Sequence, residues 1–257
     1  MGKPQSQYEV RLAQNEDDRV AAQRLRYAVF IEELGGNGPG VDHERRLECD
    51  PFDAYCRHLL LVDRNKPAGE HVVGAYRMML RSDAEAAGGF YSASEYDLSP
   101  LIQSDRSLLE LGRSCVHPAH RGGTSMYLLW NGLARFVLEQ GVDVMFGVAS
   151  FHGTDVDQLA RPLSYLHAHH LAPEELRVTA IGENRRDMDL LPPSELDRAA
   201  AMQETPALIK AYLRLGGFVG DGAYVDHEFN TVDVCLVMDT TQMNAKSREA
   251  YTRKAGR

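Results

Sequence analysis

The residues best suited to chemistry lie between Ser107 and Gln140. Glu110 is a carboxylate inside an apolar stretch, LLELG, where burial against leucines would raise its pKa toward the range of a general base. A basic turn with two glycines, HRGGT (120–124), follows, and an amphipathic helical pattern begins behind it. The N–H groups at such a helix start, beside Arg121, can bind an anion. A carboxylate that leads into an anion site indicates a group-transfer enzyme.

The elements that must position these residues follow from the same stretch. Residues 108–116 predict a buried strand, and His117-Pro118 ends it because proline cannot donate to a ladder. Ser125 is a candidate N-cap for the helix behind the turn. A second apolar run, 142–151, is nearly continuous, as expected of a strand in a parallel pairing.

A bulge is expected in the central strand. By strict alternation Glu110, Gly112 and Ser114 share one face, and Arg113 takes the other. A glycine between them favours a β-bulge, which would turn Glu110 and Arg113 to the same side.

Further elements follow from periodicity and turn signals. The sequence predicts strands at 8–12, 58–62, 72–80, 218–225 and 232–238, a helix from 15 to about 34, and helices at 157–176 and 206–215. The segment 82–100 is a polar connector. The glycine-rich, charged segment from Gly36 to Phe52 has no period and predicts a long loop.

Several motifs carry a resemblance to a known superfamily. VHPAHRGG before an apolar helix resembles the acyl-carrier-binding segment of the GCN5-related N-acyltransferases. RYAVF (26–30), DPFD (50–53), GAYRM (74–78) and LELGRSCV (109–116) resemble the branch that holds the acyl-homoserine-lactone synthases and the ornithine N-acyltransferases. The stretch 208–238, LIKAYLRLGGFVGDGAYVDHEFNTVDVCLVM, resembles the lipid-forming group of that branch. Together these motifs cover nearly the whole chain.

The resemblance implies an α/β fold of the GCN5-related N-acyltransferase type. It has a central mixed, mostly antiparallel sheet, splayed at the acyl-carrier site, with helices on both faces. We expect one N-acyltransferase domain over 1–257, with a mobile substrate loop at 36–57 and a basic tail at 240–257.

The resemblance also implies roles for particular residues. Glu110 would be the catalytic base. Substrate-binding positions would be Arg26, Phe30, Asp50, Asp53, Arg77, Arg113, Ser114 and Asp155. Acyl-carrier and phosphate contacts would come from Val116, His120, Arg121, Gly122, Gly123 and Thr124.

The residues alone leave structural roles open for several of these positions. Asp50 and Asp53 can cap the proline turn, Arg77 can belong to a structural ion pair, Phe30 favours the core, and Asp155 can cap a helix. Cys115 is interpreted as a buried strand residue and not as a nucleophile. The clustered His167, His169 and His170 have no convincing metal spacing, so we expect no metal and no resident cofactor. An acyl-phosphopantetheine thioester would be the co-substrate.

One departure from the superfamily bears on the donor. The usual signature, Q/R-x-x-G-x-G/A, has small residues at its fourth and sixth positions, but here, with Arg121 as the first position, these are Thr124 and Met126. Larger residues at these positions would make the anion-binding turn narrower, and a narrower turn suits one phosphodiester better than the pyrophosphate of coenzyme A. This favours acyl carrier protein as the acyl donor.

The leading hypothesis is therefore transfer of a 3-hydroxyacyl chain from acyl carrier protein to the α-amine of ornithine, giving lyso-ornithine lipid. Glutamine as acceptor is the nearest alternative. An acyl-homoserine-lactone synthase is disfavoured, because the only tryptophan, Trp130, lies outside the N-terminal loop where those synthases place one. A non-catalytic acyl-carrier sensor is the alternative from another class.

Composition limits partners and location. The net charge of −9 argues against nucleic-acid binding. No apolar run reaches the length of a membrane span, and the N-terminus lacks an apolar signal core, so we expect a cytoplasmic protein. The basic residues at 244–257 suggest either a solvated terminus or peripheral contact with the inner membrane or an acidic carrier. The four cysteines are expected to be reduced.

Overall fold

A computed structural model describes residues 6–242 of the chain, which divides into two compact units. The described part of the first unit comprises residues up to Met79 together with Leu111–Gly141, and the second holds Leu80–Glu110 and the residues from Val142 onward. The sequence predicts a single domain. The division into two compact units does not test whether they fold together, so the single domain stays a prediction. Most of the predicted basic tail lies outside the described residues.

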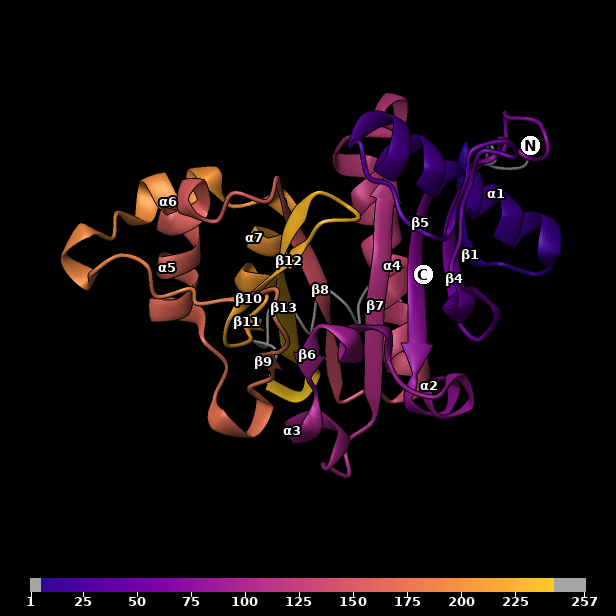
Figure 1. The fold of residues 1–257 in the computed structure, drawn as a ribbon. Helices are drawn as coiled ribbons and strands as arrows, with labels where there is room; N and C mark the ends of the chain where they lie inside the picture. The colour runs from indigo at the N-terminus through magenta and orange to yellow at the C-terminus, as the bar shows by residue number, and fades with distance from the viewer. Residues whose placement is uncertain (1–5, 243–257) are drawn as a thin grey trace. The chain divides into compact units, whose positions relative to one another are not determined.

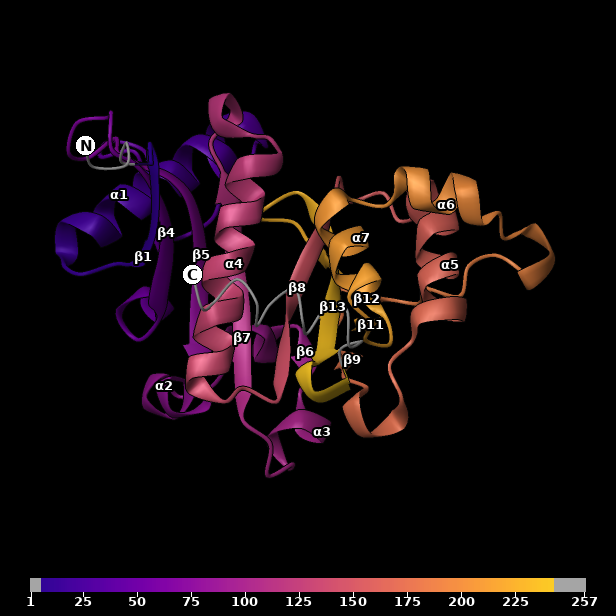
Figure 2. The same ribbon diagram turned by 180° about the vertical axis from the view of Figure 1, so that it is seen from behind.

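The first unit is a sheet between two helices. Its strands follow the order β1-β4-β5-β7. The bounds are β1 (Tyr8–Leu12), β4 (Arg57–Asp63), β5 (Val72–Leu80) and β7 (Leu108–Val116), with helices α1 (Glu16–Arg26) and α4 (Gly123–Gln140). Helix α1 lies in front of the sheet in Figure 1, and α4 lies in front of it in the reversed view of Figure 2.

The continuous apolar run of β4 follows from its position between these helices. Leu60 and Val62 pack into the core cluster that includes α1, whereas Leu59 and Leu61 point to the side of α4. Gly132 lets α4 approach closely, since a Cβ there would lie 2.4 Å from a methyl of Val10. The predicted hairpin of β4 and β5 and the predicted first strand are confirmed, and both pairings are antiparallel.

The segment from Gly36 to residue 57 is more ordered than the sequence predicts. It contains a two-stranded ladder of β2 (Val41–Asp42) and β3 (Leu47–Glu48), and the 3-10 helix η2 (Pro51–Ala54). Its mobility stays a prediction. Upstream, the predicted helix ends near Leu34 as expected, but its last part, η1 (Tyr27–Glu33), is a π-helix.

The second unit contains the start of β7 and the strands beyond it, in the order β7-β8-β13-β12-β10, with β11 also paired to β13. The strands are β8 (Val144–His152), β9 (Thr179–Ala180), β10 (Arg185–Arg186), β11 (Phe218–Val219), β12 (Ala223–Asp226) and β13 (Thr231–Asp239), with β6 (Tyr96–Asp97) paired to β9. The helices are α2 (Arg81–Ala87), α3 (Ser99–Ile102), α5 (Ala160–His170), α6 (Arg198–Glu204) and α7 (Ala207–Arg214), and the 3-10 helix η3 (Tyr91–Ser94) lies between α2 and β6.

The predicted parallel pairing is confirmed, and it is short. Leu108–Glu110 of β7 lie opposite Val144–Phe146 of β8, whereas β13 pairs antiparallel with the whole of β8. The parallel ladder therefore ends at Glu110. The described strands form the mixed, mostly antiparallel sheet that the resemblance implied.

Three predicted elements need correction. The strand expected at 218–225 is split into β11 and β12, because Gly220 packs against Val178 and Gly222 has a left-handed φ of 82°. The helix expected at 157–176 is helical as α5 only over Ala160–His170, flanked by 3-10 turns. The connector at 82–100 carries α2, η3 and β6, whose side chains Ser92, Glu95 and Tyr96 are buried.

Candidate active site

The first unit contains a closed ring of ion pairs between three arginines and three carboxylates. Arg26 pairs with Glu48 (Nε to Oε2, 2.5 Å) and with Asp53 (Nη2 to Oδ2, 2.7 Å). The ring continues through pairs of Arg113 with Glu48 and Asp50, each at 3.1 Å, and closes where Arg77 pairs with Asp50 and Asp53. Each arginine thus contacts two carboxylates, and each carboxylate contacts two arginines.

The ring is built by segments far apart in the sequence. Helix α1 supplies Arg26 at its last turn, and β3 and η2 supply the three acids. Arg77 comes from β5 and Arg113 from β7. All five charged substrate-binding positions predicted for these elements are brought together. The sequence analysis missed Glu48, although its i, i+2 spacing to Asp50 in an extended segment is a signal that could have found it.

Because the ring is buried, its charges lose their hydration, and the ring is stable only if every charge in it is paired. Arg26 and Glu48 are each 1% exposed, and Asp53 and Arg77 are each 4% exposed. Removing a charge from water costs several kcal/mol per ion, by order of magnitude, and excellent geometry must offset that cost. Gln23 donates a further hydrogen bond to Asp53 at 2.9 Å.

The structural roles predicted for the two aspartates are also present. Asp50 accepts from the Phe52 N–H at 2.9 Å, and the Asp53 carboxylate accepts from the Asp50 N–H at 3.4 Å, which forms a capping box on η2. Capping and ion pairing therefore occur together. Arg77 also lies 5.9 Å from the centre of the Phe52 ring.

The ring fixes the ionisation of its carboxylates. Burial raises the pKa of Asp53, but the hydrogen bond and charge of Arg26, with the charge of Arg77, outweigh burial and hold that pKa well below its usual range. Because every ring carboxylate already contacts two guanidinium groups, Asp50 and Asp53 have little capacity left to bind a substrate cation.

Backbone strain occurs where the sequence predicts a bulge. Arg113 has a left-handed φ of 49°, one residue after Gly112, so β7 departs from extended conformation at this place. A non-glycine residue in this region costs about 1–2 kcal/mol. The two ion pairs of Arg113 hold it there. Ser114, the next residue, is partly buried.

Phe30 lies on the π-helical segment one turn after Arg26. Its ring packs against the core cluster between α1 and the sheet, as the sequence analysis favoured. π-helical segments are rare and occur often at functional sites. Here the π-helical segment begins directly after Arg26, one of the three arginines of the ring.

The predicted anion site lies at the start of α4. Gly122 is the N-cap, no side chain caps the helix, and Gly122 and Thr124 are exposed. Ser125 is instead buried inside the first turn, so its predicted capping role is wrong. The N–H groups of this first turn have the geometry of an anion site.

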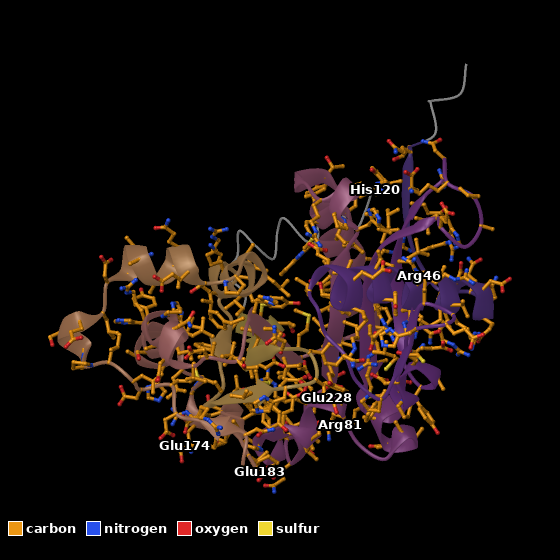
Figure 3. All side chains as sticks on the ribbon, turned by 45° about the horizontal axis from the view of Figure 1, so that its top comes forward. Arg46, Arg81, His120, Glu174, Glu183 and Glu228 are labelled. Carbon is orange, nitrogen blue, oxygen red and sulfur yellow. The ribbon has the colours of Figure 1, made fainter. Side chains whose placement is uncertain are left out.

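The side chains beside this turn already have partners. Both terminal nitrogens of Arg121 donate to Glu33 at 2.6 Å, and Arg121 Nε donates to the carbonyl of Val116 at 3.1 Å. His120, labelled in Figure 3, contacts the Tyr8 hydroxyl at 3.0 Å. A phosphate at this turn would therefore compete with Glu33 for Arg121.

Glu110, in the second unit, is a buried carboxylate held by backbone donors. It is 5% exposed. Its Oε2 accepts from the Tyr91 N–H at 2.9 Å, and its Oε1 accepts from the Ser92 N–H at 2.7 Å. These donors come from η3, inside the segment that the sequence presented only as a connector. A carboxylate oxygen has more than one lone pair, so accepting one hydrogen bond does not by itself prevent it from accepting a proton.

Two further candidates have structural roles. Asp155 is exposed and accepts from the Asp157 N–H at 3.1 Å at the start of a 3-10 turn, which is the capping alternative. Burial raises the pKa of the Cys115 thiol to about 12, which argues against a nucleophilic thiolate. All four cysteines are free thiols.

Comparisons with known proteins match this picture. Residues 25–131 match the family model of the acetyltransferase (GNAT) domain. A CoA-dependent acyl-homoserine lactone synthase, BjaI, has a similar fold with a TM-score of 0.54 at 14% identity, over 97% of this chain and 90% of that one. The acyl-homoserine lactone synthase LasI aligns with a TM-score of 0.50 at 16% identity, over 96% and 95% of the two chains. The fold is therefore that of the GNAT class, and residues 25–131 correspond to its acetyltransferase domain.

The similarity to characterised relatives is more specific. The chain is 58% identical to the L-ornithine N(alpha)-acyltransferase of Rhodobacter capsulatus over 96% of this chain and 95% of the relative. It is 40% identical to the enzyme of the same name from Brucella abortus, over 97% and 90% of the two chains. The chain belongs to the family of L-ornithine N(alpha)-acyltransferases. The predicted resemblance and the predicted fold are confirmed.

The ring should contribute strongly to the stability of the first unit. We expect Arg26→Met to lower the free energy of unfolding by about 3–5 kcal/mol, because it leaves buried carboxylates without a counter-charge. Urea titration measures the change. The matched control is Arg46→Met, since Arg46 is exposed and pairs with Glu32, and its loss should cost less than about 1 kcal/mol. Equal effects of the two substitutions would contradict this role.

The ring should also make stability depend on pH. The folded pKa of Asp53 is depressed, so its contribution is complete above the unfolded pKa, about 3.9, and is lost as pH falls below that value. The stability difference between the wild type and Asp53→Asn should shrink between pH 7 and pH 3. Thermal melting across this range measures it, with the exposed Asp187→Asn as control. A difference that stays constant would argue against the charge of Asp53.

Proposed function

We propose that this enzyme transfers a 3-hydroxyacyl chain from the phosphopantetheine thioester of acyl carrier protein to the α-amine of ornithine. The product would be lyso-ornithine lipid. The observation that carries the acceptor is the 58% identity, over nearly all of both chains, to a relative named L-ornithine N(alpha)-acyltransferase. The carrier protein as donor rests on the sequence of the anion-binding turn, where Thr124 and Met126 replace the small residues of the superfamily signature.

The reaction requires one bond to form and one to break. The neutral α-amine attacks the thioester carbonyl, the new C–N bond forms, and the C–S bond breaks to release the thiol of the carrier. The amine nitrogen must lose protons before and after attack. A general base near the amine accelerates such a step by about 10²–10⁴-fold.

Glu110 is the base in this proposal. It is buried, and its carboxylate is held in place by hydrogen bonds from two backbone N–H groups. Donors on both oxygens orient the carboxylate. Cys115 takes no part, and no covalent intermediate on the enzyme is needed.

The donor side of the reaction would use the start of α4. The N–H groups after Gly122 would bind the phosphodiester of the carrier's prosthetic group, with Arg121 released from Glu33 as a second contact. The thioester is a co-substrate and not a resident cofactor. His120, Gly123 and Val116 flank this turn.

We infer that the enzyme works in the cytoplasm, where acyl carrier protein would meet it. No helix among residues 6–242 is long and apolar enough to cross a membrane. The basic residues at 244–257 are the part of the chain suited to peripheral contact with the inner membrane. A net charge of −9 disfavours nucleic acid as a partner.

The proposal is tested by direct assay of the purified protein with mass spectrometry. The acyl donors are 3-hydroxyacyl carrier protein and the matching acyl-CoA, and the acceptors are ornithine, glutamine and S-adenosylmethionine. We expect product with ornithine and the carrier-bound donor. Glu110→Gln should lower kcat by about 10²-fold or more, because the amide cannot accept the proton.

Glu183→Gln is the control, since Glu183 is exposed in the same unit (Figure 3). The side chain of Glu110→Gln has one oxygen fewer to accept from the η3 N–H groups. Circular dichroism and the melting temperature of the variant must therefore be measured with the kinetics, to show that it is folded. Product with glutamine alone would change the acceptor. No product with any acceptor would contradict the function, and a folded, fully active Glu110→Gln would contradict the base assignment.

A further inference from the structure

Three carboxylates gather in the second unit at a place that the reaction described above does not use. Glu95, Asp226 and Asp233 each present a carboxylate oxygen, and these oxygens lie within 4.8 Å of one another. Glu95 and Asp233 are each 4% exposed, and Asp226 is partly exposed. Three acids so close together favour a positively charged ligand, but such a cluster alone does not make a site.

The strand register explains why the two aspartates meet. Asp226 of β12 lies directly opposite Thr231 of β13, and Asp233 follows Thr231 by two residues on the same face. Glu95 reaches this face from the end of η3. The neighbouring Tyr96 fixes the segment, because its hydroxyl donates to the carbonyl of Asp233 at 2.9 Å.

Thr231 is an independent sign of a ligand at this place. It is 9% exposed, and its hydroxyl has no hydrogen-bond partner among the residues that the structure describes. Alternation directs its side chain to the face that holds Asp226 and Asp233. A buried hydroxyl without a partner costs free energy unless something binds it.

One member of the cluster also has a structural duty. One oxygen of Asp226 accepts from the N–H groups of Glu228 and Phe229, at 2.8 and 3.0 Å, and caps the turn between β12 and β13. The face is open on one side, since Ser150 of β8, which lies opposite Asp233, is exposed.

The cluster shares its face and its supporting segment with Glu110. Glu110 lies opposite Phe146 in the ladder, and Phe146 is on the same face of β8 as Ser150. The η3 backbone binds Glu110 at Ser92, and Glu95 follows three residues later as the C-cap of η3.

The geometry suits an ammonium group. An ammonium has three donors, and three oxygens spaced by up to 4.8 Å surround a nitrogen at ordinary hydrogen-bond distance. The other acids suggested by the sequence for this task, Asp50 and Asp53, are each held by two arginines.

We propose that Glu95, Asp226 and Asp233, with the hydroxyl of Thr231, bind the side-chain ammonium of the acceptor amino acid. The α-amine would then be directed toward Glu110. This inference rests on the proposed function, because it names the part of the same site that distinguishes a cationic acceptor from a neutral one.

The test compares ornithine with norvaline, which has the same carbon chain but lacks the side-chain amine. In Asp233→Asn we expect KM for ornithine to rise by about 10- to 100-fold, because a charge-assisted contact is lost. KM for norvaline should change less than about threefold, because norvaline has no side-chain amine to make that contact. Thr231→Val should give a smaller rise for ornithine alone and keeps the test open if Asp233→Asn fails to fold. The control is Glu228→Gln, which removes an exposed charge beside the cluster and should change neither value (Figure 3).

Calorimetry of ornithine binding separates this inference from the proposed function. If the wild type acylates no amino acid, the proposed function fails, yet ornithine binding that is lost in Asp233→Asn still supports the site. Equal effects of Asp233→Asn on both acceptors would overturn the inference. So would binding of Mg²⁺ or Mn²⁺ that depends on Asp233, with activity lost in chelator, because the cluster would then be a metal site.

Discussion

The ring of alternating charges in the first unit is the constraint on which the local structure depends. It joins α1, the 36–57 segment, β5 and β7 through Arg26, Glu48, Asp50, Arg77 and their two partners, and most of its atoms are buried. Desolvated charges are tolerated only when all are paired, so no member can leave without exposing another. This interdependence keeps the otherwise irregular 36–57 segment against the sheet and holds Arg113 at its strained backbone angle.

Acidic residues have different tasks in the two units. In the first, each carboxylate is neutralised by two guanidinium groups and serves to fix the chain. In the second, Glu110 accepts hydrogen bonds from two backbone N–H groups of η3. The carboxylates near Thr231 form a third environment, open to one side. Surroundings, more than residue type, decide which acid is structural and which can meet a substrate.

Local patterns predicted much of the fold, and distant contacts account for what they missed. The apolar runs of β4, β5, β7 and β8 were predictable because each strand is buried on both faces over at least four consecutive residues. Motif resemblance located the arginines of the ring, but Glu48 was missed because its partners come from other elements. The 82–100 connector was undervalued in part because it contributes backbone N–H groups to Glu110, which no residue pattern reveals. The split of the strand before β13 depends on Gly220 meeting Val178, a tertiary contact.

The central claim is that the ring is structural and that a substrate cation binds elsewhere. A crystal structure with L-ornithine bound tests it most directly. The account predicts the side-chain nitrogen of ornithine within hydrogen-bond distance of Glu95 or Asp233, its α-amine nearer Glu110, and all six ion pairs of the ring intact. An ornithine ammonium bound to Asp50 or Asp53, with an arginine of the ring displaced, would contradict it.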